Sequence, residues 1–395
     1  MQSKLTVYFL IIILLVPVSL CAQGNIEISL KTVMLPDTGK LVGMGNFLFN
    51  KLPAANLKYP ATWREIEVSN ILSDESFLPI NLIRYKDTFD SVQYVVDTDG
   101  DSDFNYEPVL SFRKVGDRSI ADVVLQVQQR ANVQKHNYKV TYQIILADKA
   151  YARVAEYRSG SLRLDNNEYP INLRPLSRNN PLFSLSGETV CLIDMNRDGI
   201  FSSRWQIANN TELVRSEEIY LSEPFLIDGK KLKAVAIDSM GSKLVLQESF
   251  DSTAAAVGFK APELRFSDLN GMNDDVVRMR GKVVLIMFCS ITCPYCEQIR
   301  PQLNSIIQQN KSQDFSVIAL CKERNVDEIK TFLLNHPYEA KVGLAEPSLW
   351  QRYYIRYITP LFYLIDQEGV IRLIATGAAM APVLELMLKR LLSPH

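Results

Sequence analysis

Histidine is scarce in this sequence, which has 3 in 395 residues, at His136, His336 and His395. A nucleophile activated by histidine, or a metal site built from several histidines, therefore has few residues to draw on. An excess of charge of one sign is also lacking, because 43 basic residues balance 44 acidic ones to a net charge of −1. The composition thus predicts no nucleic-acid surface and no polybasic membrane patch.

Long apolar runs are also rare, and the one that stands out lies at the N-terminus. It follows Lys4 and is somewhat shorter than the about 20 residues of a stable membrane span. Residues 1–22 are therefore predicted to be a signal peptide or a lipoprotein signal. In the second alternative Cys21 carries the lipid, because 18-VSLC-21 partly resembles a bacterial lipobox, with Leu20 in place of the expected small residue. This segment predicts an exported protein. The protein would be periplasmic if the segment is cleaved, or membrane-anchored and facing the periplasm if the segment or a lipid holds it.

The length of the chain, and a change along it in the pattern of strand-like and helix-like segments, predict two domains. Residues 24–250 contain short extended runs such as 139-KVTYQIIL-146, rich in Val, Ile, Tyr and Thr, which predict a β-rich, sandwich-like domain whose role the sequence does not assign. Residues 251–260 are predicted to be a linker. In residues 261–395 strand-like and helix-like segments alternate, which predicts an α/β domain.

Three cysteines gather in 289-CSITCPYC-296, directly after the apolar run 283-VVLIMF-288. Cys293 and Cys296 form C-x-x-C where a strand is expected to end and a helix to begin. A thiol in the first helical turn meets unpaired backbone N–H groups and the positive end of the helix dipole, which favour the thiolate. Pro294 suits the first helical position. The pattern predicts that Cys293 is the nucleophile and that Cys296 resolves the mixed disulfide.

Other readings of the cysteines remain open from the residues alone. With Cys289 the spacing becomes C-x-x-x-C-x-x-C, which is typical of radical-SAM iron–sulfur enzymes. An exported chain with only about 100 residues after the motif is a poor match for that class. Zinc held by Cys289, Cys293, Cys296 and Cys321 would satisfy the ligand count. A structural disulfide between Cys293 and Cys296 would close only a tiny loop and constrain the unfolded chain little.

The segment 357-YITPLFYLIDQEGVIR-372 completes a recognisable pattern. Residues of about 258–392 resemble the TlpA/ResA-like (redoxin) branch of the thioredoxin superfamily. The matching pieces are 261-APELRFSDLNG-271, 281-GKVVLIMF-288, Cys293-Pro294-Tyr295-Cys296, Pro301 and 359-TPLFYLIDQEGVI-371. The resemblance implies a thioredoxin fold in which Pro360 is a cis-proline opposite the cysteines.

The same resemblance implies an extracytoplasmic thiol–disulfide oxidoreductase that requires no cofactor. Its partners would be cysteine-containing proteins and a membrane electron donor or acceptor, and reduction is favoured over oxidation. Pro294, Tyr295, Thr359 and Pro360 would contact the substrate. The alternative function is a non-catalytic binding module built on the same scaffold.

Three positions depart from the pattern of the superfamily. Thr292 replaces a common Trp, and the apolar Met287 and Ile299 stand where related proteins place an acid. The proton of Cys296 must then leave through water or through Glu297, although Glu297 is interpreted mainly as an exposed helix residue.

The remaining cysteines have two interpretations. Cys289 and Cys321 end two strands that a right-handed β-α-β crossover would place side by side, so they could form an auxiliary redox pair. The favoured interpretation is that both are small buried core residues, since neighbouring parallel strands seldom give good disulfide geometry. Cys191 is predicted to pack in a core.

Two acidic segments, 95-VVDTDGDSDF-104 and 192-LIDMNRDGIF-201, look alike. Oxygen side chains at alternate positions suit Ca²⁺, and Gly199 stands where such a loop needs a sharp turn. The expected terminal acid falls on Pro108 in the first segment and on Trp205 in the second, so neither loop is complete. Solvated turns explain both equally well. The predicted calcium ligands are Asp97, Asp99, Asp101, Asp194, Asn196 and Asp198.

Overall fold

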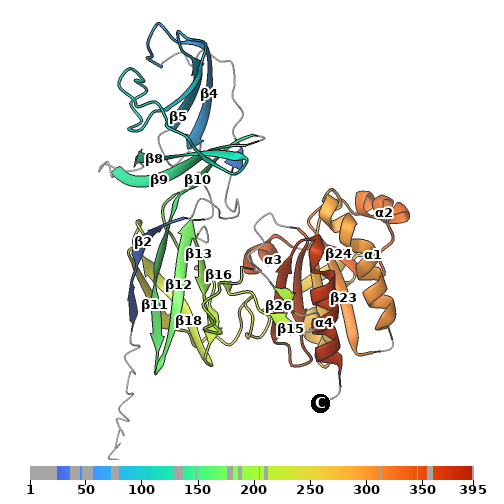
Figure 1. Ribbon diagram of the computed structural model, residues 1–395. Coiled ribbons are helices and arrows are strands. Elements are labelled where there is room, and N and C mark those ends of the chain that lie inside the picture. The colour runs from blue at the N-terminus through green and yellow to red at the C-terminus, as the bar shows by residue number, and fades with distance from the viewer. Residues whose placement is uncertain are drawn as a thin grey trace, which may run out of the picture.

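The structure is a computed structural model of the chain (Figure 1). It describes residues 25–35, 45–46, 57–72, 80–128, 137–147, 149–175, 181–185, 189–203, 205–208, 212–311, 313–344, 346–353 and 359–393. The predicted signal segment 1–22, including Cys21, lies outside the described residues. Among the helices that are described, none is both long and apolar enough to cross a membrane.

The described elements between Ile26 and Glu248 are β-strands. Two sheets of this part face each other across a shared core. One has the strand order β1-β19-β18-β17 and the other β16-β13-β12-β11-β2. Their strands are β1 (Ile26–Ser29), β2 (Lys31–Met34), β11 (Glu156–Leu164), β12 (Asn167–Pro175), β13 (Thr189–Ile193), β16 (Glu218–Tyr220), β17 (Phe225–Ile227), β18 (Lys230–Ile237) and β19 (Lys243–Glu248).

A second group of sheets packs around a separate core above the first group in Figure 1. It has the orders β3-β10-β9-β8-β7 and β4-β5-β6. Its strands are β3 (Gly45–Asn46), β4 (Arg64–Leu72), β5 (Ile80–Lys86), β6 (Val92–Val96), β7 (Arg113–Val115), β8 (Arg118–Gln128), β9 (Asn137–Leu146) and β10 (Ala150–Val154). The strongly β-branched composition accounts for these strands. The predicted domain boundaries near residues 250 and 260 stay predictions.

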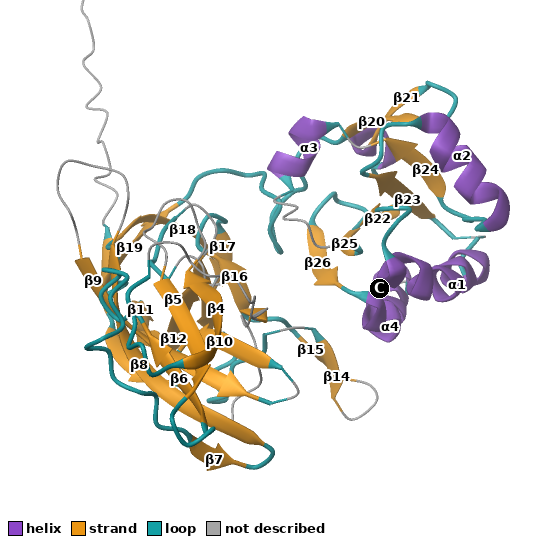
Figure 2. Cartoon of the chain, turned by 90° about the horizontal axis from the view of Figure 1, so that it is seen from above, coloured by secondary structure: helices purple, strands orange, loops and turns teal. Residues whose placement is uncertain are grey.

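The C-terminal part is a seven-stranded sheet in the order β21-β20-β24-β23-β22-β25-β26, with helices around it (Figure 2). Strands β22, β23 and β24 run parallel, β25 pairs antiparallel with β22, and β26 pairs antiparallel with β25. The strands are β20 (Arg265–Asp268), β21 (Asn273–Asp275), β22 (Val283–Cys289), β23 (Phe315–Cys321), β24 (Lys341–Leu344), β25 (Leu361–Ile365) and β26 (Ile371–Thr376). The helices are α1 (Pro294–Gln309), α2 (Val326–Asn335), α3 (Pro347–Arg352) and α4 (Ala381–Leu392), with short 3₁₀ helices at Val276–Met279 and Ala378–Met380.

Strand β22 lies at the centre of this sheet, and every one of its residues is buried. Side chains on its two faces belong to two different cores, and one of these cores contains buried residues of α1 and α4. A strand covered on both faces needs an unbroken apolar run, which 283-VVLIMFC-289 provides. This architecture confirms the predicted α/β, thioredoxin-like C-terminal fold.

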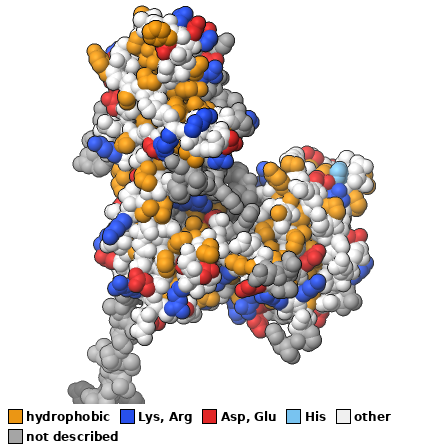
Figure 3. Space-filling view, viewed as in Figure 1, with side chains coloured by type: hydrophobic (Ala, Val, Ile, Leu, Met, Phe, Trp, Pro, Cys, Tyr) orange, Lys and Arg blue, Asp and Glu red, His pale blue; other side chains and the backbone are white. Residues whose placement is uncertain are grey.

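A hairpin of the β-rich part packs on the C-terminal part. It consists of β14 (Gln206–Ala208) and β15 (Glu212–Val214) and lies beside α4 (Figure 1). Trp205, at its start, is only 7% exposed and belongs to the same core as Phe362 and Leu388. The predicted linker is also packed, because Phe259 is fully buried. The two parts meet side by side, and the face shown in Figure 3 carries charged side chains of both signs.

Candidate active site

Cys293 and Cys296 lie where β22 gives way to α1. Cys293 is the residue that precedes the helix, with extended backbone angles (φ −88°, ψ 114°), and Pro294 occupies the first turn. The carbonyl oxygen of Cys293 accepts hydrogen bonds from the N–H groups of Cys296, at 3.1 Å, and Glu297, at 3.3 Å. Cys293 is half-buried, whereas Cys296 is only 1% exposed. Only the first of the two thiols is thus open to a protein partner.

The two thiols differ in acidity. Burial would raise the pKa of Cys293, but hydrogen bonds from the Thr359 side chain and from Cys296 and Tyr295 hold that pKa below its ordinary value. Burial raises the pKa of Cys296 to about 12, and the neighbouring thiol of Cys293 contributes to the rise. The more accessible sulfur is therefore also the better source of thiolate, as an attacking thiol requires.

The segment that opens β25 faces the first thiol. Cys293 Sγ lies 3.3 Å from the carbonyl oxygen of Thr359. The peptide bond between Thr359 and Pro360 is cis, and Pro360 is buried. The carbonyl oxygen of Pro360 accepts a hydrogen bond from the N–H of Gly377, at 3.0 Å, which ties this segment to the end of β26.

The structure thus brings Cys293, Thr359 and Pro360 together across 66 residues of sequence. Pro294 and Tyr295 are exposed beside Cys293, and the Tyr295 side chain is 59% exposed. Their contact with a substrate stays a prediction.

A polar group behind the cysteines was missed by the sequence reasoning. Ser290 Oγ donates a hydrogen bond to Glu323 Oε1, at 2.5 Å, and lies 2.9 Å from Thr292 Oγ1. The other carboxylate oxygen of Glu323 is buried and has no hydrogen-bond partner among the described residues. Strand β23 runs parallel to β22, so a residue just past its end could have been expected beside Ser290.

The carboxylate of Glu297 lies against two basic side chains. Its Oε2 lies 2.6 Å from His336 Nδ1 and 3.3 Å from Arg300 Nε. The side chain is 27% exposed, in line with a helix surface position. A path for the Cys296 proton through Glu297 stays a prediction.

Cys289 and Cys321 lie side by side in register on β22 and β23. Their Sγ atoms are 3.6 Å apart, and both residues are buried free thiols. Contact with Cys321 and burial raise the pKa of Cys289 well above its ordinary value. Cys191 is also a buried free thiol, and burial raises its pKa. Thiols held protonated in a core behave as small apolar side chains.

The iron–sulfur and zinc alternatives need at least three cysteine sulfurs around one point. Within the part of the chain that the structure describes, one group of three His, Cys, Asp or Glu side chains has ligand atoms all within 4.8 Å of one another. That group is Asp97, Asp99 and Asp101, so the cysteines are not arranged as a metal cage.

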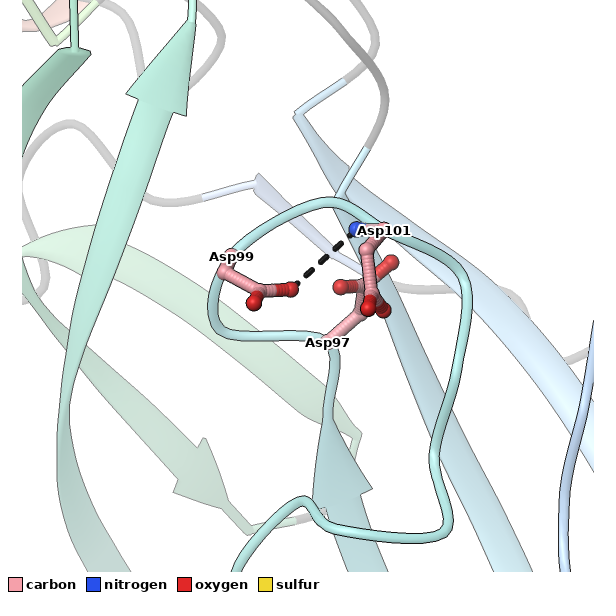
Figure 4. Close-up of side chains that lie close together, drawn as sticks. All are labelled: Asp97, Asp99 and Asp101. Carbon is pink, nitrogen blue, oxygen red and sulfur yellow. Dashed lines mark hydrogen bonds between the residues drawn. The ribbon is translucent and has the colours of Figure 1, made fainter.

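The acidic group lies in the loop after β6 (Figure 4). Asp97 is fully buried and accepts hydrogen bonds from the N–H groups of Gly100, at 2.7 Å, and Ser102, at 3.1 Å. Burial raises the pKa of Asp97 to about 6, and the acids nearby add to the rise. The N–H of Asp101 donates to Asp99, at 3.2 Å. Three carboxylates so close together suit a divalent cation.

In the second loop Asp194 accepts hydrogen bonds from the N–H groups of Asp198, at 3.1 Å, and Gly199, at 2.9 Å. Asn196 donates its amide to Asp198, at 2.9 Å. Each loop also receives a glutamate that the spacing did not predict. Glu107 contacts Thr98 of the first loop, and Glu217 accepts the N–H of Met195 in the second. Glu217 directly precedes β16, beyond the reach of a local motif.

Calcium binding by these loops stays a prediction, and it has a thermal test. In the absence of a cation, the raised pKa of Asp97 means that its contribution to stability is lost as pH rises through about 6. Saturating Ca²⁺ at neutral pH is expected to raise Tm by about 3 °C or more, and the gain should shrink below about pH 6. Asp97→Asn should remove the part of the gain in Tm that comes from the first loop. Equal Tm values in calcium and in chelator would contradict the prediction.

The fold and the geometry of the two thiols place the C-terminal part among the thioredoxin-fold thiol–disulfide oxidoreductases. Residues 257–374 match the family model of the AhpC/TSA family. A thiol-disulfide oxidoreductase ResA of Geobacillus thermodenitrificans (strain NG80-2) is 31% identical over 133 residues, which are 32% of this chain and 73% of that protein. The corresponding protein of Geobacillus kaustophilus (strain HTA426) is 29% identical over 149 residues, 36% of this chain and 82% of that protein.

A crystal structure described as a thiol:disulfide interchange protein DsbE from Chlorobium tepidum shares 25% identity, with a TM-score of 0.32, and covers 37% of this chain and 100% of that chain. The chain belongs to the ResA family of thiol–disulfide oxidoreductases. The ResA relatives match about a third of the chain, so the resemblance concerns the C-terminal part.

Proposed function

We propose that the chain exchanges electrons with protein cysteines through Cys293 and Cys296, which alternate between dithiol and disulfide. One observation carries the proposal. The half-exposed thiol of Cys293, with its lowered pKa, lies against the backbone of Thr359, while the thiol of Cys296 is buried behind it. An accessible nucleophile with a hidden resolving thiol is the arrangement that exchange requires.

Reduction of a substrate disulfide proceeds in two steps. The Cys293 thiolate attacks one sulfur of the substrate disulfide, forms a mixed disulfide and releases the other substrate sulfur as a thiolate. Cys296 then gives up its proton and attacks Cys293 Sγ, which closes the Cys293–Cys296 disulfide and frees the second substrate thiolate. Two electrons pass to the substrate, and its two thiolates take up two protons. The reverse sequence oxidises a dithiol.

The proposal favours the reducing direction, on the resemblance to the ResA-like branch. A turnover then leaves the Cys293–Cys296 disulfide, so a membrane electron donor must return it to the dithiol. The N-terminal segment of residues 1–22 would export the chain to the periplasm, where it would be free or anchored to the membrane. No cofactor is required for thiol–disulfide exchange itself.

A direct exchange assay tests the proposal. The full chain, reduced with a small dithiol, should reduce a disulfide-bonded protein faster than an unstructured dithiol peptide at the same concentration. Equal rates would instead favour a binding module on a thioredoxin scaffold, because the fold would then give the thiols no advantage.

A further inference from the structure

A cavity lies between the edges of two sheets. Strand β26 is the last strand of the seven-stranded sheet, and β16 is the last strand of a sheet in the β-rich part. The cavity between them has a volume of about 320 Å³, and Glu218–Tyr220 and Ile374–Thr376 line it. Both strands occur at the junction of the two parts in Figure 1. An open sheet edge presents unpaired backbone groups to whatever enters the space beside it.

Half of the β26 edge is already paired. The segment before β20 covers the start of this strand, because Gly258 N–H donates to the Ile371 carbonyl, at 2.8 Å, and Ile371 N–H donates to the Phe259 carbonyl, at 2.9 Å. This segment therefore behaves as a short added strand. It shows that the edge of β26 accepts an extended backbone.

The other half of the edge faces the cavity. Gly377 N–H bonds to Pro360, and the register pairs Thr376 with Leu361. Backbone groups alternate in direction along an antiparallel strand, so those of Ile374 and Thr376 point away from β25 and into the cavity. Within the described ranges, no backbone group pairs with them. The edge thus offers N–H donors and C=O acceptors over the length of a short peptide.

The cavity also holds a cationic side chain with unused hydrogen-bonding capacity. Arg215 lines it, and the Nε of Arg215 is buried without a hydrogen-bond partner among the described residues. A buried unpaired donor is destabilising, and a carboxylate ligand would supply the missing hydrogen-bond partner. The acids nearby are occupied. Glu218 pairs with Arg174, at 3.4 Å, and Glu217 accepts the N–H of Ser202, at 2.9 Å.

The rest of the lining is largely apolar and includes the buried residues Phe225, Tyr363 and Met380. The cavity also adjoins the reactive site, because the lining residue Leu361 directly follows Pro360. A substrate chain that passed from Cys293 over Thr359 and Pro360 would therefore lead toward the cavity.

We infer that this cavity binds an extended segment of a cysteine-containing protein substrate as an added strand on β26, with an acidic side chain of that segment on Arg215. Side chains of an added strand alternate between two faces, so apolar neighbours of the acid would meet Phe225, Tyr363 and Met380. The inference rests on the proposed exchange function and gives the β-rich part a role in substrate selection.

Paired peptides test it. Two disulfide-bonded peptides of identical length would be compared, one with an Asp near the cysteine and one with Asn in its place. The wild-type chain should reduce the acidic peptide with a KM about 10-fold lower, the effect of one charge-assisted hydrogen bond. Arg215→Gln should erase that preference by raising KM for the acidic peptide while leaving kcat unchanged. Arg265→Gln, an exposed arginine on β20, serves as the matched control and should keep the preference.

A third peptide tests the strand pairing without altering the protein. N-methylation of alternate amides removes donors from the ligand and should raise KM for both sequences. If N-methylation has no effect, the cavity is not a strand site and a small carboxylate is the better occupant. If the wild type shows no acidic preference, or Arg215→Gln keeps it, the inference is wrong.

The neutral disulfide 2,2′-dithiodipyridine separates this inference from the proposed function. Its exchange rate should be the same for wild type and Arg215→Gln, because it needs Cys293 alone. Normal exchange with this reagent but no preference for the acidic peptide would overturn only the inference that the cavity binds substrate. Absence of exchange with every disulfide would overturn the proposed function, and the inferred role of the cavity would fall with it.

Discussion

Replacing Cys293 by serine is expected to lower the rate of disulfide exchange with a protein substrate by at least about 1,000-fold. The half-exposed Cys293 thiol lies against Thr359 and has a lowered pKa, while Cys296 is buried and its thiol has a pKa of about 12. A serine hydroxyl cannot form the mixed disulfide, and Cys296 cannot reach a protein substrate from its buried position. The measurement is reduction of a disulfide-bonded protein under a constant supply of small dithiol.

Cys191→Ser is the matched control for that experiment. Cys191 is a buried free thiol in the β-rich part, with no place in the proposed exchange. The Cys191→Ser variant should retain exchange activity close to that of the wild type once the two proteins are compared at equal folded concentration. A Cys293→Ser protein within about tenfold of the wild-type rate would show that the exchange does not begin at this sulfur.

The second large effect is a difference in alkylation rate between the two thiols. With a pKa of about 12, Cys296 carries at least about 1,000-fold less thiolate at neutral pH than Cys293, whose pKa lies below its ordinary value of 9.0. The weaker nucleophilicity of the more acidic thiolate returns part of this difference. Cys293 is still expected to react with iodoacetamide at least about 30-fold faster, and burial of Cys296 widens the gap.

The pH dependence of this reaction follows from the same shifts. The rate at Cys293 should rise with pH with a midpoint below 9.0, whereas the rate at Cys296 should still be far from its plateau there. Peptide mapping after timed alkylation of the reduced protein gives both rates. In guanidinium chloride the two cysteines should react alike, since the fold causes the difference. Equal rates in the native protein would contradict the assigned acidities.

The position of Cys293 and Cys296 at the start of α1 could be predicted from the sequence because the relevant interactions are local. The run 283-VVLIMFC-289 is apolar throughout because the strand is buried on both faces, and Pro294 marks the helix start beside Cys293. The position of Pro360 opposite Cys293 required the resemblance, because no local rule brings together residues this far apart. Sequence spacing thus located the two cysteines at the helix start, and the fold family supplied the distant contact with Thr359 and Pro360.

Other contacts depend on pairings between distant strands and could not be predicted. Glu323 meets Ser290 because β23 lies beside β22, and Glu217 reaches the second acidic loop from the position just before β16. Trp205 entered the sequence reasoning only as the wrong residue for a calcium loop, yet it is buried in the C-terminal core. Alternation of apolar residues predicts strands but not which strands meet, so the order of sheets in the β-rich part was also out of reach.

Trapping of the reaction intermediate tests the central claim most directly. Cys296→Ser removes the proposed resolving thiol but leaves Cys293, so incubation of this full-length variant with a disulfide-bonded protein substrate should accumulate a mixed disulfide. Mass spectrometry of the adduct should join the substrate cysteine to Cys293 and to no other residue, and a small dithiol should release it. An adduct on Cys289 or Cys321, or no adduct while the wild type exchanges normally, would contradict the account.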